Sequence, residues 1–197
     1  MKNKLLNIKD SKNLHFLPLG GSGEIGMNFN MYGFKNKWLI IDCGVSFKDS
    51  KVIGADVFMP DINVINESNL DVCGMFITHA HEDHIGGVHH LWPSIKCPIY
   101  TTPFSGHLLK QRLIDAGLYE KVDLKIVNKE TKFSIGPFNL ELINISHSIL
   151  ESNSVMISVG NMKVFHTGDW KIDVHPSIGN KANSKRLQEI GKAGVNG

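Results

Sequence analysis

The sequence predicts a mixed α/β fold, and three observations lead to this prediction. Apolar runs of strand length outnumber the helical patterns, and in the first half of the chain the helical patterns fall between the strands. Clusters of Gly, Pro, Asn and Ser separate the runs. The 197 residues, of which 42% are hydrophobic and 20% charged, can bury a sizeable core in one globular domain or in part of one.

The first half of the chain supplies five predicted strands and two predicted helices. Residues 1–13 are polar and are expected to form a loose tail, so the predicted domain covers 14–197. We expect strands at 14–19, 29–34, 38–42, 72–78 and 98–102, with a tight turn at 35–37. A short helix is expected after Gly86-Gly87 and should stop at Pro93. A longer helix is expected over 103–118, with proline near its start and glycine at its end.

The second half reads mostly as strands. Four are expected at 131–135, 138–145, 154–160 and 162–169, with turns at Gly136-Pro137 and Gly160-Asn161. A short helix is expected over 184–194.

Composition excludes several classes of protein. The formal net charge of +2 shows no overall electrostatic footprint for nucleic acid, although a local basic patch is compatible with it. The three cysteines are far apart and form no CxxC pair, which argues against a disulfide framework or a cysteine-type zinc finger. The N-terminal apolar run is too short for a signal peptide, and no segment reaches the length of a membrane span. We therefore expect a cytoplasmic protein without a membrane partner.

A glycine-rich loop, "GGSGEIG" at 20–26, follows the first predicted strand. Its Gly21-x-Gly23-x-x-Gly26 spacing matches a dinucleotide-binding fingerprint, but that fingerprint requires a helix directly after the loop. Here an aromatic-rich, strand-like stretch follows instead. We expect a loop that borders an active site and does not open a helix.

The stretch "THAHEDHIGG" at 78–87 concentrates histidine and acid at the end of a buried strand. Because side chains alternate along a strand, His79 and His81 should lie on one side of the chain and reach one metal ion. Asp83 and His84 then turn back and can reach a second ion. A solvated polar loop is the alternative, but an apolar strand leads directly into the cluster.

Two later residues can complete such a site. His147 is expected to end a strand, and Asp169 follows the last predicted strand in a Gly-Asp turn, where its carboxylate can bridge two ions. Either residue alone is a weak signal. The remaining histidines are expected to have structural or surface roles, with His166 packing behind the site.

Six stretches together resemble the bacterial ribonuclease J family within the metallo-β-lactamase superfamily: "LGGSGEIGMN", "IDCGVSF", "GADVFMPDI", "THAHEDHIGG", "SHSILES" and "HTGDWKID". The resemblance covers about Leu17 to Gly194 and implies an αββα sandwich. It departs from the family at Leu150-Glu151, where relatives usually have Pro-Asp.

The resemblance implies a β-CASP-type nuclease, a 5′–3′ exonuclease and endonuclease that hydrolyses RNA phosphodiesters with metal-activated hydroxide. It implies two Zn²⁺ ions. One is held by His79, His81 and His147, and the other by Asp83 and His84, with Asp169 bridging them. Catalytic roles fall to Asp83, His84 and Asp169. Asp42 resembles the acid that steadies the ligand histidines. RNA and zinc are the implied partners, with a homo-oligomer expected at full length.

Two other functions remain open from the sequence. The zinc motif also fits a different hydrolase of this fold, acting on a lactone, thioester or small phosphodiester. A non-catalytic zinc-binding remnant is the other possibility, because the β-CASP insertion and the second half of the domain are expected to be absent. We therefore expect the chain as it stands to expose apolar surface, to bind zinc incompletely and to show little ribonuclease activity.

Overall fold

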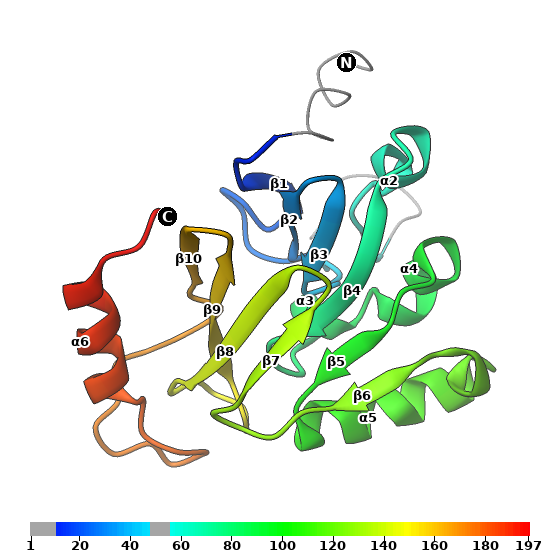
Figure 1. Cartoon of the computed structure of the whole chain (residues 1–197). Coiled ribbons are helices and arrows are strands. Elements are labelled where there is room, and N and C mark those ends of the chain that lie inside the picture. Colours follow the sequence, from blue (N-terminus) through cyan, green and yellow to red (C-terminus); the bar gives the residue numbers. More distant parts are fainter. Residues whose placement is uncertain (1–10, 48–55) are drawn as a thin grey trace.

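Two β-sheets stack face to face between outer layers of helices in the computed structural model, which describes residues 11–47 and 56–197 (Figure 1). Most of the predicted tail, and the first two residues of "GADVFMPDI", lie outside the described residues.

The larger sheet has six strands in the order β1-β2-β3-β4-β5-β6. Its strands are β1 (His15–Gly20), β2 (Phe29–Phe34), β3 (Lys37–Ile41), β4 (Asp71–Ile77), β5 (Ile99–Thr101) and β6 (Leu124–Ile126). The first three are antiparallel, and β3 to β6 are parallel. Lys35 and Asn36 have positive φ in the tight turn between β2 and β3, which suits the twist of a two-residue hairpin.

The smaller sheet is antiparallel, in the order β10-β9-β8-β7. Its strands are β7 (Lys132–Ile135), β8 (Phe138–Asn144), β9 (Asn153–Val159) and β10 (Met162–His166). The turns between them contain Gly136 and Gly160, both at positive φ, as the predicted hairpins require.

The helices cover the outer faces of the two sheets. Most lie against the larger sheet: α2 (Asn63–Glu67), α3 (Glu82–Ile85), α4 (Val88–Ile95), α5 (Pro103–Asp115) and a 3₁₀ turn (Tyr119–Lys121). The last helix, α6 (Ser184–Ala193), lies beside the smaller sheet, so the layers follow the order helix, sheet, sheet, helix (Figure 1).

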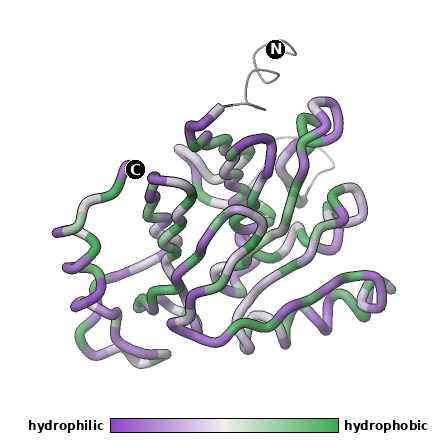
Figure 2. The backbone as a smooth tube through the Cα atoms, in the orientation of Figure 1, coloured by the Kyte–Doolittle hydropathy of each residue, from purple (hydrophilic) through white to green (hydrophobic). Residues whose placement is uncertain are grey.

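Three apolar clusters hold these layers together. One fills the space between the larger sheet and its helices and includes Trp38, Ile85 and Leu109. The second lies between the two sheets, where Phe76 meets strands of the smaller sheet such as β8 and β9. The third joins α6 to the smaller sheet through Ile190. In Figure 2, hydrophobic and hydrophilic residues alternate along α6, as an amphipathic helix on a sheet requires.

Most predicted elements are present within a few residues of their expected bounds, but one prediction is wrong. Pro93 does not stop the helix after Gly87, because α4 continues through it to Ile95. Proline removes one backbone hydrogen bond, and packing offsets this cost: Trp92 is buried, and its indole N–H donates to the Cys97 carbonyl at 2.7 Å. Four short elements, α2, α3, β6 and the 3₁₀ turn, were not predicted, since three to five residues carry too little periodicity.

Apolar surface is exposed beside α6, as expected. A pocket of about 760 Å³ lies between α6 and the segment that follows Asp169. Trp170, Ile172 and Val174 line it and are exposed. Among the residues that the structure describes, no helix is long and apolar enough to cross a membrane.

The attachment of α6 leads to a pH-dependent prediction. Arg186 donates to both carboxylate oxygens of Glu141 on β8, at 2.6 and 2.9 Å, and this contact lowers the pKa of Glu141 below 4.5. A carboxyl group whose pKa is lower in the folded state stabilises the fold at pH values above its unfolded-state pKa. This stability is lost as the pH falls through its folded-state pKa. Glu141→Gln should therefore cost about 1 kcal/mol or less at neutral pH, since the pair is partly exposed. Urea unfolding should show this difference disappearing below pH 4, and a difference that grows in acid would contradict the prediction.

Candidate metal centre

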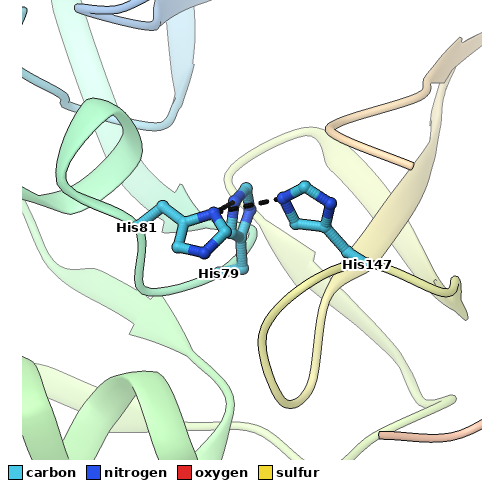
Figure 3. Close-up of side chains that lie close together, drawn as sticks. All are labelled: His79, His81 and His147. Carbon is cyan, nitrogen blue, oxygen red and sulfur yellow. Dashed lines mark hydrogen bonds between the residues drawn. The ribbon is translucent and has the colours of Figure 1, made fainter. Parts of the chain in front are cut away.

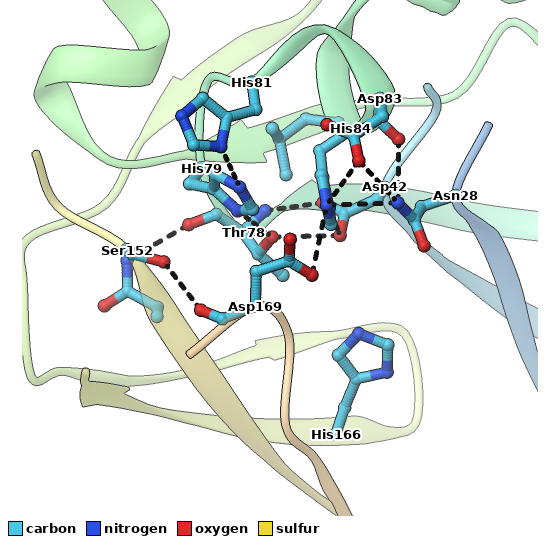
Figure 4. Close-up of polar contacts among 12 residues, drawn as sticks. Asn28, Asp42, Thr78, His79, His81, Asp83, His84, Ser152, His166 and Asp169 are labelled. Atoms are coloured by element: carbon cyan, nitrogen blue, oxygen red, sulfur yellow. Dashed lines mark hydrogen bonds and ion pairs between the residues drawn. The ribbon is translucent and has the colours of Figure 1, made fainter. Parts of the chain in front are cut away.

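The predicted ligands and Asp42 lie where four segments leave the ends of strands. Asp42 follows β3, His79 to His84 follow β4, His147 lies beyond β8, and Asp169 lies beyond β10. These strand ends from both sheets meet at one edge of the sandwich, so residues far apart in the sequence face one another (Figure 4).

Three histidine rings point toward one another (Figure 3). His81 Nδ1 lies 3.1 Å from His79 Nε2 and 3.1 Å from His147 Nε2. The ligand atoms of all three lie within 4.8 Å of one another, as the sequence predicts for one ion. The reason differs from the predicted one. Strand β4 ends at Ile77 and β8 at Asn144, so loops, and not strand alternation, bring the rings together.

His79 is held by a relay of hydrogen bonds from Asp42. The Thr78 backbone N–H donates to Asp42 Oδ1 at 2.7 Å, and the Thr78 hydroxyl donates to Asp42 Oδ2 at 2.9 Å. That hydroxyl has a single proton, so His79 Nδ1, 2.9 Å away, is the donor to Thr78 Oγ1. His79 Nε2 therefore presents its lone pair to the centre. Burial, followed by the charge of His84, lowers the pKa of His79 to about 3 and keeps it neutral.

His84 is oriented by the same carboxylate. Its Nδ1 lies 2.7 Å from Asp42 Oδ2, and both side chains are buried. Its Nε2 faces Asp169 Oδ1 at 3.4 Å and Asp83 Oδ2 at 3.6 Å. Burial acts to lower the pKa of His84, but the Asp42 and Asp169 carboxylates raise it to about 10. The same pairing keeps the pKa of Asp42 below its usual value despite complete burial.

Asp169 stands between the two sets of histidines. Besides its approach to His84, its Oδ2 lies 3.7 Å from His147 Nε2. The hydrogen bond with His84 lowers the pKa of Asp169 to about 2, so the carboxylate is ionised at neutral pH. A carboxylate with one oxygen toward each set has the geometry that bridging requires.

The ligand atoms of His79, His84 and Asp169 form a second group within 4.8 Å of one another. Because His79 Nδ1 is engaged by Thr78, only its Nε2 is free, and one lone pair can serve one ion. Asp83 belongs to neither compact group, although its carboxylate lies beside His84 Nε2. The second set is thus His84 and Asp169, with Asp83 at its margin.

The glycine loop reaches the centre through a residue that the sequence did not single out. The loop opens no helix, as predicted, and Asn28 follows it. Asn28 Nδ2 lies 3.1 Å from His84 Nε2 and donates to the Asp83 carbonyl at 3.0 Å. Gly21 has a φ of +80°, and a Cβ there would lie 2.2 Å from Asn28 Oδ1. The glycine therefore makes room for Asn28 beside the site.

His166 packs behind the site, as expected. Its Nδ1 lies 3.0 Å from the Tyr32 hydroxyl, and burial lowers its pKa. It belongs to neither group of possible ligands in the described part of the chain.

Similarity to known proteins covers most of this architecture. The chain is 37% identical over 193 residues to ribonuclease J of Sinorhizobium meliloti and 35% identical over 191 residues to that of Helicobacter pylori. Both matches cover 96% of this chain but only 34% and 28% of the relatives. The chain thus spans about a third of their length.

Solved structures show the same fold at low sequence identity. A protein of unknown function from Enterococcus faecalis matches with a TM-score of 0.60 and 16% identity, covering 82% of this chain and 44% of its own. The metallo-beta-lactamase fold protein YhfI from Bacillus subtilis matches with a TM-score of 0.57 and 17% identity, covering 80% and 63%. The family model of the metallo-beta-lactamase superfamily matches residues 28–171, which include every predicted ligand. The chain belongs to the metallo-beta-lactamase superfamily.

Proposed function

We propose that this chain carries the metal centre of a zinc-dependent ribonuclease that hydrolyses RNA phosphodiesters. The observation that supports this most is the convergence of His79, His81 and His147 beside His84 and Asp169. Similarity to ribonucleases J along 96% of the chain supports RNA as the substrate.

The donor set fits zinc. Imidazole nitrogen and carboxylate oxygen are ordinary zinc ligands. Three ring nitrogens turned toward one another, with at least His79 neutral, leave lone pairs that one shared cation satisfies. His79, His81 and His147 would hold one ion, and His84 and Asp83 the second, with Asp169 between them. Such ions supply activated water and polarise a phosphoryl oxygen.

The chain's own residues prepare this chemistry. Asp42 holds the proton on His84 Nδ1 and, through Thr78, the proton on His79 Nδ1, so both rings present Nε2 to the centre. Asp83, whose side chain is 30% exposed, lies at the margin of the centre, with Oδ2 3.6 Å from His84 Nε2. It is placed to accept a proton from the attacking water and to orient it toward phosphorus.

The test of this function uses this chain and a chimera in which it replaces the matching region of the Sinorhizobium meliloti ribonuclease J. The chain alone should bind zinc. The zinc-loaded chimera should degrade 5′-monophosphorylated RNA, and His81→Ala should reduce the rate by at least about 100-fold. His175→Ala, an exposed histidine, is the matched control.

Two results would contradict the proposal. One is a folded, zinc-loaded chimera that leaves RNA intact. The other is an RNA-degrading activity that is unchanged by His81→Ala. A lactone and thioester panel run with the chain alone tests the alternative hydrolases, because turnover there without RNA cleavage would assign the site to them.

A further inference from the structure

Helix α5 touches both of the loops that carry the proposed ligands. Near its start, the backbone N–H of Phe104 donates to Glu151 Oε2 at 2.8 Å. Near its end, the Arg112 guanidinium binds Glu82, with Nη1 2.9 Å from Oε2 and Nη2 on Oε1. Glu82 lies between His81 and Asp83, and Glu151 lies four residues after His147. One helix therefore contacts two ligand-bearing segments that are separate in the sequence.

The Glu151 contact fixes the His147 loop from outside the metal centre. The Ile145 N–H donates to the Ser152 carbonyl at 3.2 Å and closes the loop. The Glu151 side chain contacts α5 and Lys129, whose Nζ lies 3.0 Å from Oε1. Asn153 Nδ2 donates to the Glu151 carbonyl at 2.6 Å, which holds the backbone in its left-handed conformation at a φ of +58°.

The charge of Glu151 is stabilised where it stands. Burial acts to raise its pKa, but the Phe104 N–H and the Lys129 ammonium offset this and lower it. The carboxylate also meets the N-terminal end of α5, where free N–H groups favour negative charge. A neutral or shorter side chain would lose part of this anchoring.

The Glu82 contact fixes the other loop. Glu82 begins the short helix α3, and the His84 and Ile85 N–H groups both donate to the His81 carbonyl at 2.9 Å. A two-point bond from Arg112 therefore restrains the first turn of α3, and with it the direction of His81.

Helix α5 is rigid enough to connect the two anchors. It has 13 residues, and Leu109 and Leu113 are completely buried in the cluster beneath the larger sheet. Gly106 packs closely against β6, where a Cβ would lie only 2.2 Å from the Ile126 side chain. The helix cannot slide without disturbing this packing.

We propose that α5 is a brace that sets the separation of His81 and His147, with Glu82 and Glu151 as positioning residues for the metal centre. This inference rests on the proposed function, because it requires zinc at the three histidines.

The test compares zinc affinity with folding stability. Glu82→Ala and Glu151→Ala should each raise the zinc Kd about tenfold, as loss of groups that orient ligands does. Glu151→Gln should recover part of the affinity, because its amide oxygen still accepts from Phe104. The double variant should raise the zinc Kd by less than the product of the two single increases, since either change already releases one end of the brace. Chelator competition measures Kd, and urea unfolding of the metal-free chain measures stability.

Glu141→Ala is the matched control. It breaks another two-point Arg–Glu pair between a helix and a second element, and neither residue lies in a loop that carries a proposed ligand. It should leave the zinc Kd unchanged. The brace is wrong if both alanine variants keep a Kd within about twofold of the parent chain, or if Glu141→Ala weakens zinc equally. A parent chain that binds no zinc would instead remove the proposed function, and the brace with it.

Discussion

Replacing Asp42 with alanine is expected to destabilise the metal-free chain by about 3–5 kcal/mol, the cost of removing one partner from a buried ionic pair. Asp42 is completely buried and accepts from the Thr78 N–H, the Thr78 hydroxyl and His84 Nδ1. Alanine leaves these groups without an acceptor and removes the carboxylate nearest to the His84 ring, so that only the more exposed Asp169 and Asp83 still face its charge.

Asp42→Asn separates charge from backbone strain. Asp42 has a φ of +66°, which asparagine tolerates better than alanine. The amide fills the same space, but one of its two ends must present a donor to groups that are themselves donors. We expect a loss above about 2 kcal/mol.

The control for both variants is Asp71→Asn. This residue forms an exposed pair with Lys37, and because water screens such a pair its loss should cost far less than the loss of Asp42. Urea unfolding in the presence of a chelator measures all three changes. If Asp42→Ala costs no more than Asp71→Asn, the Asp42 network does not support the fold as described.

Local pattern made most of the fold predictable. The strands of both sheets carry apolar runs bounded by turn residues, and β2 begins and ends where the sequence predicted. The short elements were not predicted because their apolar residues are too few to define a period. The predicted helix end at Pro93 was wrong because that prediction used local backbone geometry alone, whereas the burial of Trp92 depends on tertiary packing.

The proposed ligands could be predicted from the sequence, whereas several residues around them could not. His79, His81, Asp83 and His84 lie together in the sequence. His147 and Asp169 were candidates from their positions after predicted strands, and the family resemblance supported both and added Asp42. Asn28, Glu82 and Glu151 carry no comparable signal, since an isolated amide or carboxylate in a loop is ordinary. Their contacts join residues 30 to 56 positions apart, which only the folded topology specifies.

The stoichiometry of zinc binding provides the second large expected effect. His79→Ala should weaken the binding of one zinc ion by more than about 100-fold. Loss of a residue that only orients a ligand lowers metal affinity about 10–100-fold, and loss of the ligand itself should lower it further. It should leave the second ion in place, because His79 Nε2 has one lone pair, although it is close to both groups of ligand atoms.

Asp169→Asn distinguishes this assignment, in which Asp169 joins the two zinc sites, from the alternative in which His79 joins them. Asp169 approaches both His84 and His147, so its loss should weaken both ions. Metal analysis after gel filtration, followed by chelator competition, measures occupancy and affinity for each variant, with the exposed His175→Ala as the control. If His79→Ala removes both ions while Asp169→Asn removes one, His79 rather than Asp169 joins the two sites. The division of the ligands into one set of three histidines and one set around His84 would then be wrong.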